Sequence, residues 1–169
     1  MNDTTRDNVT IYTDGGSSGN PGPGGYGVVM LWKGHRKELS AGYHHTTNNR
    51  MELMGVIAGI KALKKPCRVT VVSDSQYVVD AIEKGWLKNW QKRNWRTTDK
   101  KPVKNIDLWK QISEQLAIHE VTFQWVRGHS GHPENERCDQ LAVAAYGQKK
   151  LLEDTGFEND KQGVANLFG

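Results

Sequence analysis

Apolar and polar positions along the chain predict an ordered series of strands and helices. Segments in which apolar residues alternate with polar ones, or run together between turn residues, predict strands. Segments in which apolar residues recur at three- and four-residue spacing predict amphipathic helices. The expected strands cover residues 9–13, 26–32, 37–45, 68–73 and 121–126. The expected helices cover residues 50–64, 76–84, 106–117 and 133–146.

Turn-forming residues separate these elements. The glycine- and proline-rich residues 15–27 predict a long irregular turn, and residues 33–36 predict a hairpin between the second and third strands. Pro66 ends the first helix, Gly85 closes the second and Pro133 opens the last. Three strands followed by alternating helices and strands predict an α/β fold with a mixed sheet flanked by helices, not a pure Rossmann alternation.

The length of 169 residues fits a single domain. We expect a polar N-terminal extension over residues 1–8 and one catalytic domain over residues 9–151, which includes a basic protrusion at residues 84–104. The polar tail over residues 152–169 is expected to be partly disordered.

Composition narrows the class of protein. The apolar fraction of 36% and charged fraction of 25% are typical of a globular protein. No run of 18 apolar residues predicts a membrane span, and the polar N-terminus does not resemble a signal peptide. Two cysteines, Cys67 and Cys138, make neither a disulfide framework nor a zinc site. A reducing cytoplasmic location is therefore expected.

Positive charge is concentrated in one part of the chain. The net charge is +4, yet residues 84–104 hold eight lysines or arginines and one acid, Asp99. That stretch therefore carries about +7, and the remainder carries about −3. A localised basic surface of this kind is typical of nucleic-acid binding.

Four acidic residues stand at element boundaries, where a carboxylate has no obvious packing role. Asp14 and Asp74 each follow an expected strand, at the sheet edge where α/β folds place their chemistry. Glu52 lies in the first turn of the helix over residues 50–64, where the helix dipole alone would favour an acid. Asp139 lies near the start of the last helix. A solvated surface charge is the ordinary alternative for each of them.

Carboxylates gathered in one place cannot all ionise without a compensating positive charge. Two divalent ions about 4 Å apart would supply it, activating a water on one side and stabilising a leaving oxygen on the other. Mg²⁺ suits oxygen ligands that leave room for water and a phosphate. Structural Ca²⁺ is the alternative, but the repeating acid spacing of a calcium loop is missing. The expected reaction is in-line hydrolysis of a phosphodiester.

Further residues fit a nucleic-acid substrate. His129, between Gly128 and Gly131, offers an imidazole that can move a proton near neutral pH, although an isolated loop histidine is more often a surface residue. Tryptophans interleave with the cations of the basic stretch and could cover sugars and bases, or could pack inward. Amide-bearing turns could read 2′-hydroxyls and base edges, or could simply form turns. The tryptophans are Trp86, Trp90 and Trp95, and the polar turns are Asn20, residues 46–49 and Gln76.

Several long segments in matching order resemble bacterial ribonuclease HI. They are Tyr12-Thr13-Asp14-Gly15, residues 19–27, residues 46–53, Asp74-Ser75-Gln76-Tyr77-Val78, the basic stretch, and Gly128-His129 through to Asp139. The resemblance covers about residues 8–158. It implies a ribonuclease H-like fold with a five-stranded mixed sheet, three antiparallel strands being followed by parallel ones. It also implies cleavage of the RNA strand of RNA–DNA hybrids to 3′-hydroxyl and 5′-phosphate ends by a monomer.

The resemblance also implies residue roles. Asp14, Glu52, Asp74 and Asp139 match the family's metal-binding and catalytic carboxylates, holding two Mg²⁺ ions for which Mn²⁺ can substitute, and His129 matches its catalytic loop histidine. Residues that match minor-groove contacts are Asn20, Asn48, Asn49 and Gln76. Residues that match contacts to a DNA-strand phosphate are Thr47, Lys92 and Asn105. The matching basic protrusion contributes Trp86, Arg93, Trp95, Lys100 and Lys101.

Two other functions are considered. A strand-transfer enzyme of the integrase or transposase type would use a similar metal cluster, but the amide-rich turns and the loop histidine favour hybrid cleavage. A non-catalytic hybrid-binding module would keep the basic stretch and lose carboxylates, whereas all four are present.

Overall fold

The structure, a computed structural model, describes residues 6–157 and contains a five-stranded mixed sheet in the order β3-β2-β1-β4-β5. The strands are β1 (Asn8–Ser17), β2 (Gly22–Trp32), β3 (His35–Thr46), β4 (Arg68–Ser73) and β5 (Glu120–Trp125). The first three strands are antiparallel neighbours, and β4 and β5 run parallel to β1. This arrangement confirms the expected α/β class and mixed sheet.

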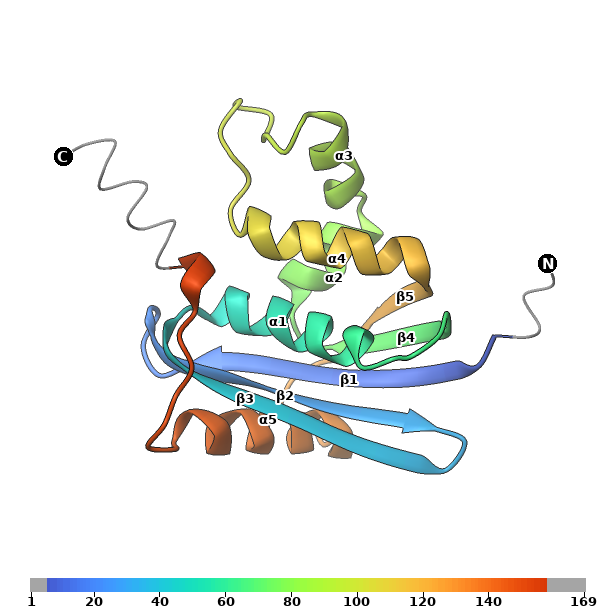
Figure 1. The fold of residues 1–169 in the computed structure, drawn as a ribbon, viewed down its shortest axis with the longest axis vertical. Helices are drawn as coiled ribbons and strands as arrows, with labels where there is room; N and C mark the ends of the chain where they lie inside the picture. The colour runs from blue at the N-terminus through green and yellow to red at the C-terminus, as the bar shows by residue number, and fades with distance from the viewer. Residues whose placement is uncertain (1–5, 158–169) are drawn as a thin grey trace.

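Between residues 48 and 146 the chain forms five helices, and helices lie on both sides of the sheet. They are α1 (Asn48–Lys61), α2 (Gln76–Glu83), α3 (Trp86–Lys92), α4 (Ile106–Ile118) and α5 (Pro133–Tyr146). Figure 1 shows α1, α2 and α4 on one side of the sheet and α5 on the other, with α3 and the loop after it farthest from the sheet. The main core lies between the sheet and α1, α2 and α4, and Trp109 is its largest fully buried side chain. None of the helices within residues 6–157 has the length and hydropathy that a membrane span requires.

The glycine-rich segment differs from the expected long turn over residues 15–27. Strand β1 continues to Ser17 and β2 begins at Gly22, so every glycine of this segment except Gly19 lies within a strand. Helices approach the strands too closely for a side chain. A Cβ atom on Gly15 would lie 2.5 Å from the Met51 carbonyl carbon of α1, and one on Gly27 would lie 2.1 Å from the Cys138 carbonyl oxygen of α5. Gly15 and Gly27 therefore serve helix–sheet packing, whereas Gly19, with a left-handed φ of 83°, lies in the turn between β1 and β2.

The close approach at Gly27 predicts a stability effect. Gly27→Ala should lower the free energy of unfolding by about 1–3 kcal/mol, because α5 must shift to make room for the methyl group. Gly147→Ala is the matched control, since a Cβ there meets its nearest atom at 3.4 Å and the backbone φ is −80°. Denaturant unfolding compares the two, and equal stability would contradict a packing role for Gly27.

Helix boundaries follow local caps. Helix α1 begins two residues earlier than expected because the Thr47 hydroxyl accepts a hydrogen bond from the Arg50 amide at 3.3 Å. It ends at Lys61 and not at residue 64, and α3 was not expected as a helix. Strand β4 and helix α5 have the expected limits.

The chain continues past α5 along the domain. Leu152 pairs with Tyr43 of β3: its carbonyl accepts from the His44 amide at 2.8 Å, and its own amide donates to the Gly42 carbonyl at 2.9 Å. Two residues later, Asp154 is buried. Residues 152–157 therefore continue the domain beyond the boundary expected at residue 151. Residues 158–169, for which disorder is expected, lie outside the described residues, as do residues 1–5 of the expected extension.

Candidate active site and nucleic-acid surface

Three of the four singled-out carboxylates meet at the end of the central strands. Asp14 lies in β1, Asp74 follows β4, and Glu52 lies in α1, and one carboxylate oxygen from each lies within 4.8 Å of the others. The parallel register pairs Thr13 with Ser73, so the next residue of each strand is an aspartate at the same sheet edge. Parallel strands thus bring together two acids that lie 60 positions apart in the sequence.

Burial and mutual repulsion disfavour the ionised forms. Burial, followed by the charges of Asp74 and Asp139, raises the pKa of Asp14 to about 8. Burial, followed by the charges of Asp14 and Asp74, raises the pKa of Glu52 well above its ordinary range. The Glu52 Oε2 atom is buried without a hydrogen-bond partner among the described residues. These groups fit a bound divalent cation, which would satisfy both the charge and the unpaired oxygen.

Asp139 stands slightly apart from this group. It is half-buried in α5, and its charge contributes to the raised pKa of Asp14. Its carboxylate does not belong to the set within 4.8 Å. The structure therefore places a fourth acid beside a three-carboxylate centre.

The loop between β5 and α5 lies against the cluster. A Cβ atom on Gly128 would lie 2.7 Å from Asp74 Oδ2, so a side chain here would push on this carboxylate. The adjacent His129 is exposed and has a left-handed φ of 54°. The indole of Trp125 donates to the Asp74 carbonyl at 3.1 Å. Gly128 and Trp125 were not expected as supports; the glycine before His129 was the signal available in the sequence.

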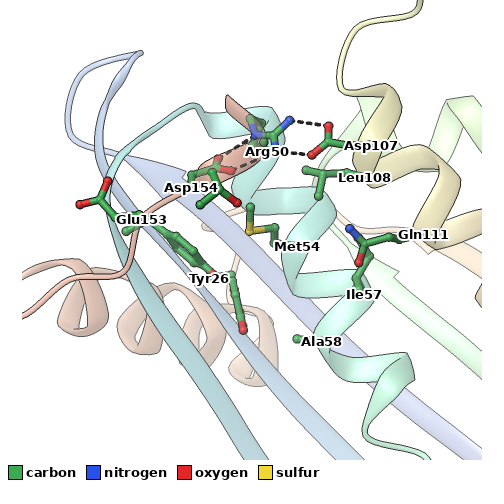
Figure 2. Close-up of a pocket in the computed structure, with 13 residues that line it drawn as sticks. Tyr26, Arg50, Met54, Ile57, Ala58, Asp107, Leu108, Gln111, Glu153 and Asp154 are labelled. Atoms are coloured by element: carbon green, nitrogen blue, oxygen red, sulfur yellow. Dashed lines mark hydrogen bonds and ion pairs between the residues drawn. The ribbon is translucent and has the colours of Figure 1, made fainter. Parts of the chain in front are cut away.

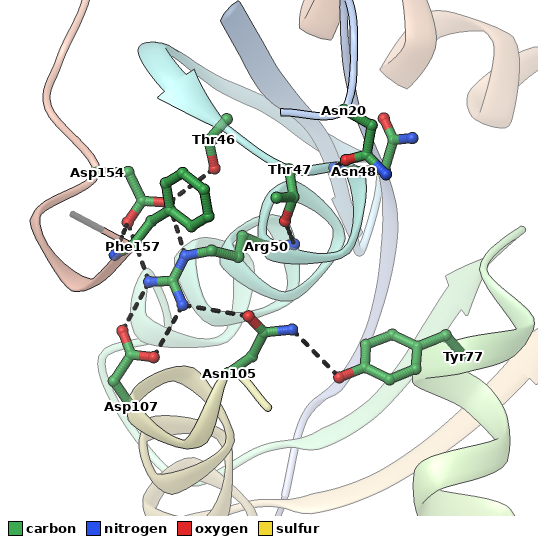
Figure 3. Close-up of polar contacts among 10 residues, drawn as sticks. All are labelled: Asn20, Thr46, Thr47, Asn48, Arg50, Tyr77, Asn105, Asp107, Asp154 and Phe157. Carbon is green, nitrogen blue, oxygen red and sulfur yellow. Dashed lines mark hydrogen bonds and ion pairs between the residues drawn. The ribbon is translucent and has the colours of Figure 1, made fainter. Parts of the chain in front are cut away.

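Two of the expected amides meet at the start of α1. The Asn48 Oδ1 atom accepts from the Ser17 amide at 2.8 Å and from its hydroxyl at 3.0 Å. The Asn48 backbone amide donates to Asn20 Oδ1 at 3.0 Å, and Figure 3 shows the two side chains together. Both carbonyl oxygens are thus used within the protein, which leaves the NH₂ groups as donors toward a ligand. Asn49 and Gln76 are also exposed.

Thr47 and Asn105, which the resemblance links to a phosphate, lie on either side of Arg50 (Figure 3). The Thr47 hydroxyl caps α1. Asn105 precedes α4 in a left-handed conformation, its Oδ1 accepts from Arg50 Nη1 at 3.3 Å, and its Nδ2 donates to the Tyr77 hydroxyl at 3.4 Å. Arg50 and Tyr77 were not expected to support the site. A cation within the mostly apolar α1 was the only signal for Arg50 in the sequence.

The basic stretch forms an exposed protrusion. All eight of its lysines and arginines are exposed, including Lys92, Arg93, Lys100 and Lys101. The tryptophans differ from one another. Trp86 is 38% exposed beside the Lys84 ammonium, whereas the half-buried Trp90 and Trp95 pack against the core. Trp95 therefore serves packing as well as any contact with a ligand.

Known proteins are similar to this chain in sequence and in architecture. A model of the RNase H family matches residues 6–146. A ribonuclease H from Desulforamulus reducens is 62% identical over 143 residues, which cover 85% of this chain and 90% of the relative.

Solved structures of ribonucleases H are similar to this chain. The crystal structure of LC9-RNase H1, a type 1 RNase H, shares 33% identity and a TM-score of 0.79 over 88% of this chain and 76% of that one. LC11-RNase H1, solved in complex with an RNA/DNA hybrid, shares 26% identity and a TM-score of 0.64 over 82% of this chain and 96% of that one. The sheet order, the acidic cluster and these matches agree, and the chain belongs to the ribonuclease H family.

Proposed function

We propose that this enzyme hydrolyses the RNA strand of RNA–DNA hybrids, leaving 3′-hydroxyl and 5′-phosphate ends, and that it requires divalent metal ions at Asp14, Glu52 and Asp74. The observation that carries the proposal is the meeting of these three carboxylates within 4.8 Å, with raised pKa values for Asp14 and Glu52. Carboxylates buried this close together cannot all be ionised near neutral pH unless a bound cation compensates their charge.

The acidic residues and His129 have different roles in the proposed reaction. Asp14, Glu52, Asp74 and Asp139 would hold two Mg²⁺ ions, for which Mn²⁺ can substitute, with the first three carboxylates already gathered within 4.8 Å. When bound, the ions supply an activated water and a stabilised leaving oxygen. His129, exposed on the loop that passes Asp74, exchanges a proton with water or product at its imidazole.

The surface around the cluster suits a hybrid duplex. The amides of Asn20, Asn48, Asn49 and Gln76 contact the minor groove, where 2′-hydroxyls mark the RNA strand. A DNA-strand phosphate is bound by Thr47, Lys92 and Asn105. Contacts of the protrusion with the duplex come from Trp86, Arg93, Trp95, Lys100 and Lys101. The hybrid bound to LC11-RNase H1 supports this choice of substrate.

Metal binding tests the proposal directly. We expect the wild-type protein to bind Mn²⁺ without substrate, because three carboxylate oxygens lie within 4.8 Å of one another. The electron paramagnetic resonance signal of free Mn²⁺ should therefore fall as the protein is added. Asp74→Asn should weaken this binding at least about tenfold, since it removes a charged ligand. Asp80→Asn on α2 is the control. Equal Mn²⁺ affinity in the two variants would place the metal elsewhere.

Neutralising the protrusion should change the salt dependence of binding. We replace three residues of the protrusion together by glutamine: Lys92, Arg93 and Lys100. A plot of log hybrid affinity against log salt concentration should then become less steep, by roughly 0.7–0.9 for each phosphate that the protein no longer neutralises. A triple glutamine variant of Lys37, Lys149 and Lys150, exposed residues outside the protrusion, carries the same charge change. Equal slopes in both variants would show that the protrusion is not a binding surface.

We also propose a cytoplasmic monomer. The two cysteines, Cys67 and Cys138, are buried and free, as a reducing compartment allows. One continuous core forms within a single chain. Sedimentation equilibrium tests the monomer, and a dimer mass across micromolar concentrations would contradict it.

A further inference from the structure

Arg50 is a buried cation that joins three parts of the chain. Its side chain is 1% exposed, and its guanidinium binds both Asp154, with Nε to Oδ2 at 2.7 Å, and Asp107, with Nη2 to Oδ2 at 2.7 Å. It also donates to Asn105 Oδ1 at 3.3 Å. Figure 2 shows the guanidinium between the two carboxylates. The segment after α5, the start of α1 and the start of α4 therefore meet at one side chain.

Asp154 has no role in the carboxylate cluster, yet it is as buried as Arg50, with 1% of its side chain exposed. Its Oδ2 atom also accepts from the Thr46 hydroxyl at 2.7 Å, and its Oδ1 atom accepts from Arg50 Nη2 at 3.0 Å. A buried carboxylate is costly unless its oxygens are paired in this way. The segment over residues 152–157 therefore holds Arg50 through Nε and Nη2, and Asp107 holds the same guanidinium through Nη1 at 2.9 Å and Nη2 at 2.7 Å.

Arg50 in turn fixes the orientation of Asn105. A guanidinium has donors only, so the Asn105 carbonyl oxygen must face it. The Asn105 amide nitrogen then faces the Tyr77 hydroxyl, which is itself held by the Trp109 indole at 2.9 Å. Without the guanidinium, the Asn105 side chain could rotate and present its oxygen, an unsuitable partner for a phosphate.

We propose that Asp154 is a positioning residue for hybrid binding: through Arg50 it holds Asn105 with its NH₂ group toward the DNA-strand phosphate. The segment over residues 152–157 thus contributes to substrate binding as well as to the packing of the domain. This inference rests on the proposed function, because the phosphate contact of Asn105 belongs to that proposal.

Asp154→Asn tests the inference in the full-length protein. We expect the Kd for a short RNA–DNA hybrid at 0.1 M salt to rise roughly five- to tenfold, as for a weakened hydrogen bond to a charged group. The value of kcat at saturating hybrid should stay within about twofold, and the salt slope should not change, because Asn105 is neutral and releases no counterion. Glu153→Gln, an exposed neighbour, should change neither quantity. Measurements are made at a temperature where unfolding curves show each variant fully folded.

A double-mutant cycle with Asn105→Ala separates positioning from general loosening. If Asp154 acts through Asn105, Asp154→Asn should add little to the Kd of the Asn105→Ala protein. Additive effects on Kd, or an unchanged Kd in Asp154→Asn, would overturn the inference while leaving the proposed function intact. An unchanged Kd in Asn105→Ala itself would instead remove the phosphate contact, and the inference with it. If Asp154→Asn does not fold, Thr46→Val, which removes one donor to the same carboxylate, should shift Kd in the same direction by a smaller factor.

Discussion

Replacing Asp14 or Asp74 by asparagine is expected to lower the rate of hybrid cleavage in Mg²⁺ by at least about 10³-fold, or about 4 kcal/mol of transition-state stabilisation. Each substitution keeps the size of the side chain and removes a charged ligand from the group of oxygens within 4.8 Å. Hybrid affinity should be retained, since losing a negative charge beside a phosphate does not weaken binding. Single-turnover cleavage of a labelled hybrid, with affinity measured in Ca²⁺, separates the two effects.

The control for this experiment is Asp80→Asn, whose carboxylate pairs with Lys84 on α2. Its cleavage rate should stay within about twofold of wild type, because a surface ion pair is worth little. Near-normal Mg²⁺-supported rates in both Asp14→Asn and Asp74→Asn, with the proteins shown to be folded, would contradict the assignment of the cluster.

The same cluster should make the metal-free protein less stable as pH rises. Asp14 keeps its proton up to about pH 8 in the folded protein, whereas in the unfolded chain it ionises near its ordinary pKa of 3.8. Between these values the unfolded state binds fewer protons, so the free energy of unfolding falls with increasing pH. In chelator at pH 9, Asp14→Asn should therefore be more stable than wild type, by about 2–5 kcal/mol.

Denaturant unfolding at pH 4 and pH 9 measures this effect as a difference between the two proteins, which cancels the titration of groups outside the cluster. At pH 4 the two should differ by less than about 1 kcal/mol. Adding Mg²⁺ at pH 8 should stabilise wild type by about 2.7 kcal/mol at 100 times Kd and should stabilise Asp14→Asn far less. A wild-type stability that rises from pH 4 to pH 9 relative to Asp14→Asn would show that Asp14 is not destabilised by burial.

Much of the fold could be predicted because the periodicity of apolar residues reports burial directly. Strand β4 and helix α5 have the expected limits for that reason. The long turn expected over residues 15–27 was wrong because glycine is common in turns, and the sequence does not show which helices pack closely on these strands. The docking of residues 152–157 depends on Asp154 meeting Arg50, 104 positions away in the sequence, and a polar segment carries no periodic signal for such a contact.

The candidate site, like the fold, could be predicted from the sequence only in part. The meeting of Asp14 and Asp74 could be predicted because both follow the last pair of the parallel register between β1 and β4, although β1 does not end at residue 13 as expected and continues to Ser17. Glu52, expected in the first turn of its helix, is the fifth residue of α1, so its place beside the aspartates follows from how α1 packs on β1. The orientation of the amides could not be predicted, because it depends on partners such as Ser17 and Arg50 in other elements.

The most direct measurement of the central claim uses an RNA–DNA hybrid with a distinct label on each strand, incubated with the protein in chelator and then in Mg²⁺. We predict metal-dependent cuts within the RNA strand, with 3′-hydroxyl and 5′-phosphate ends, while the DNA strand and an RNA–RNA duplex stay whole. Joined DNA strands would instead identify a strand-transfer enzyme. Intact RNA in a stable complex at saturating Mg²⁺ would identify a binding module and contradict hybrid cleavage.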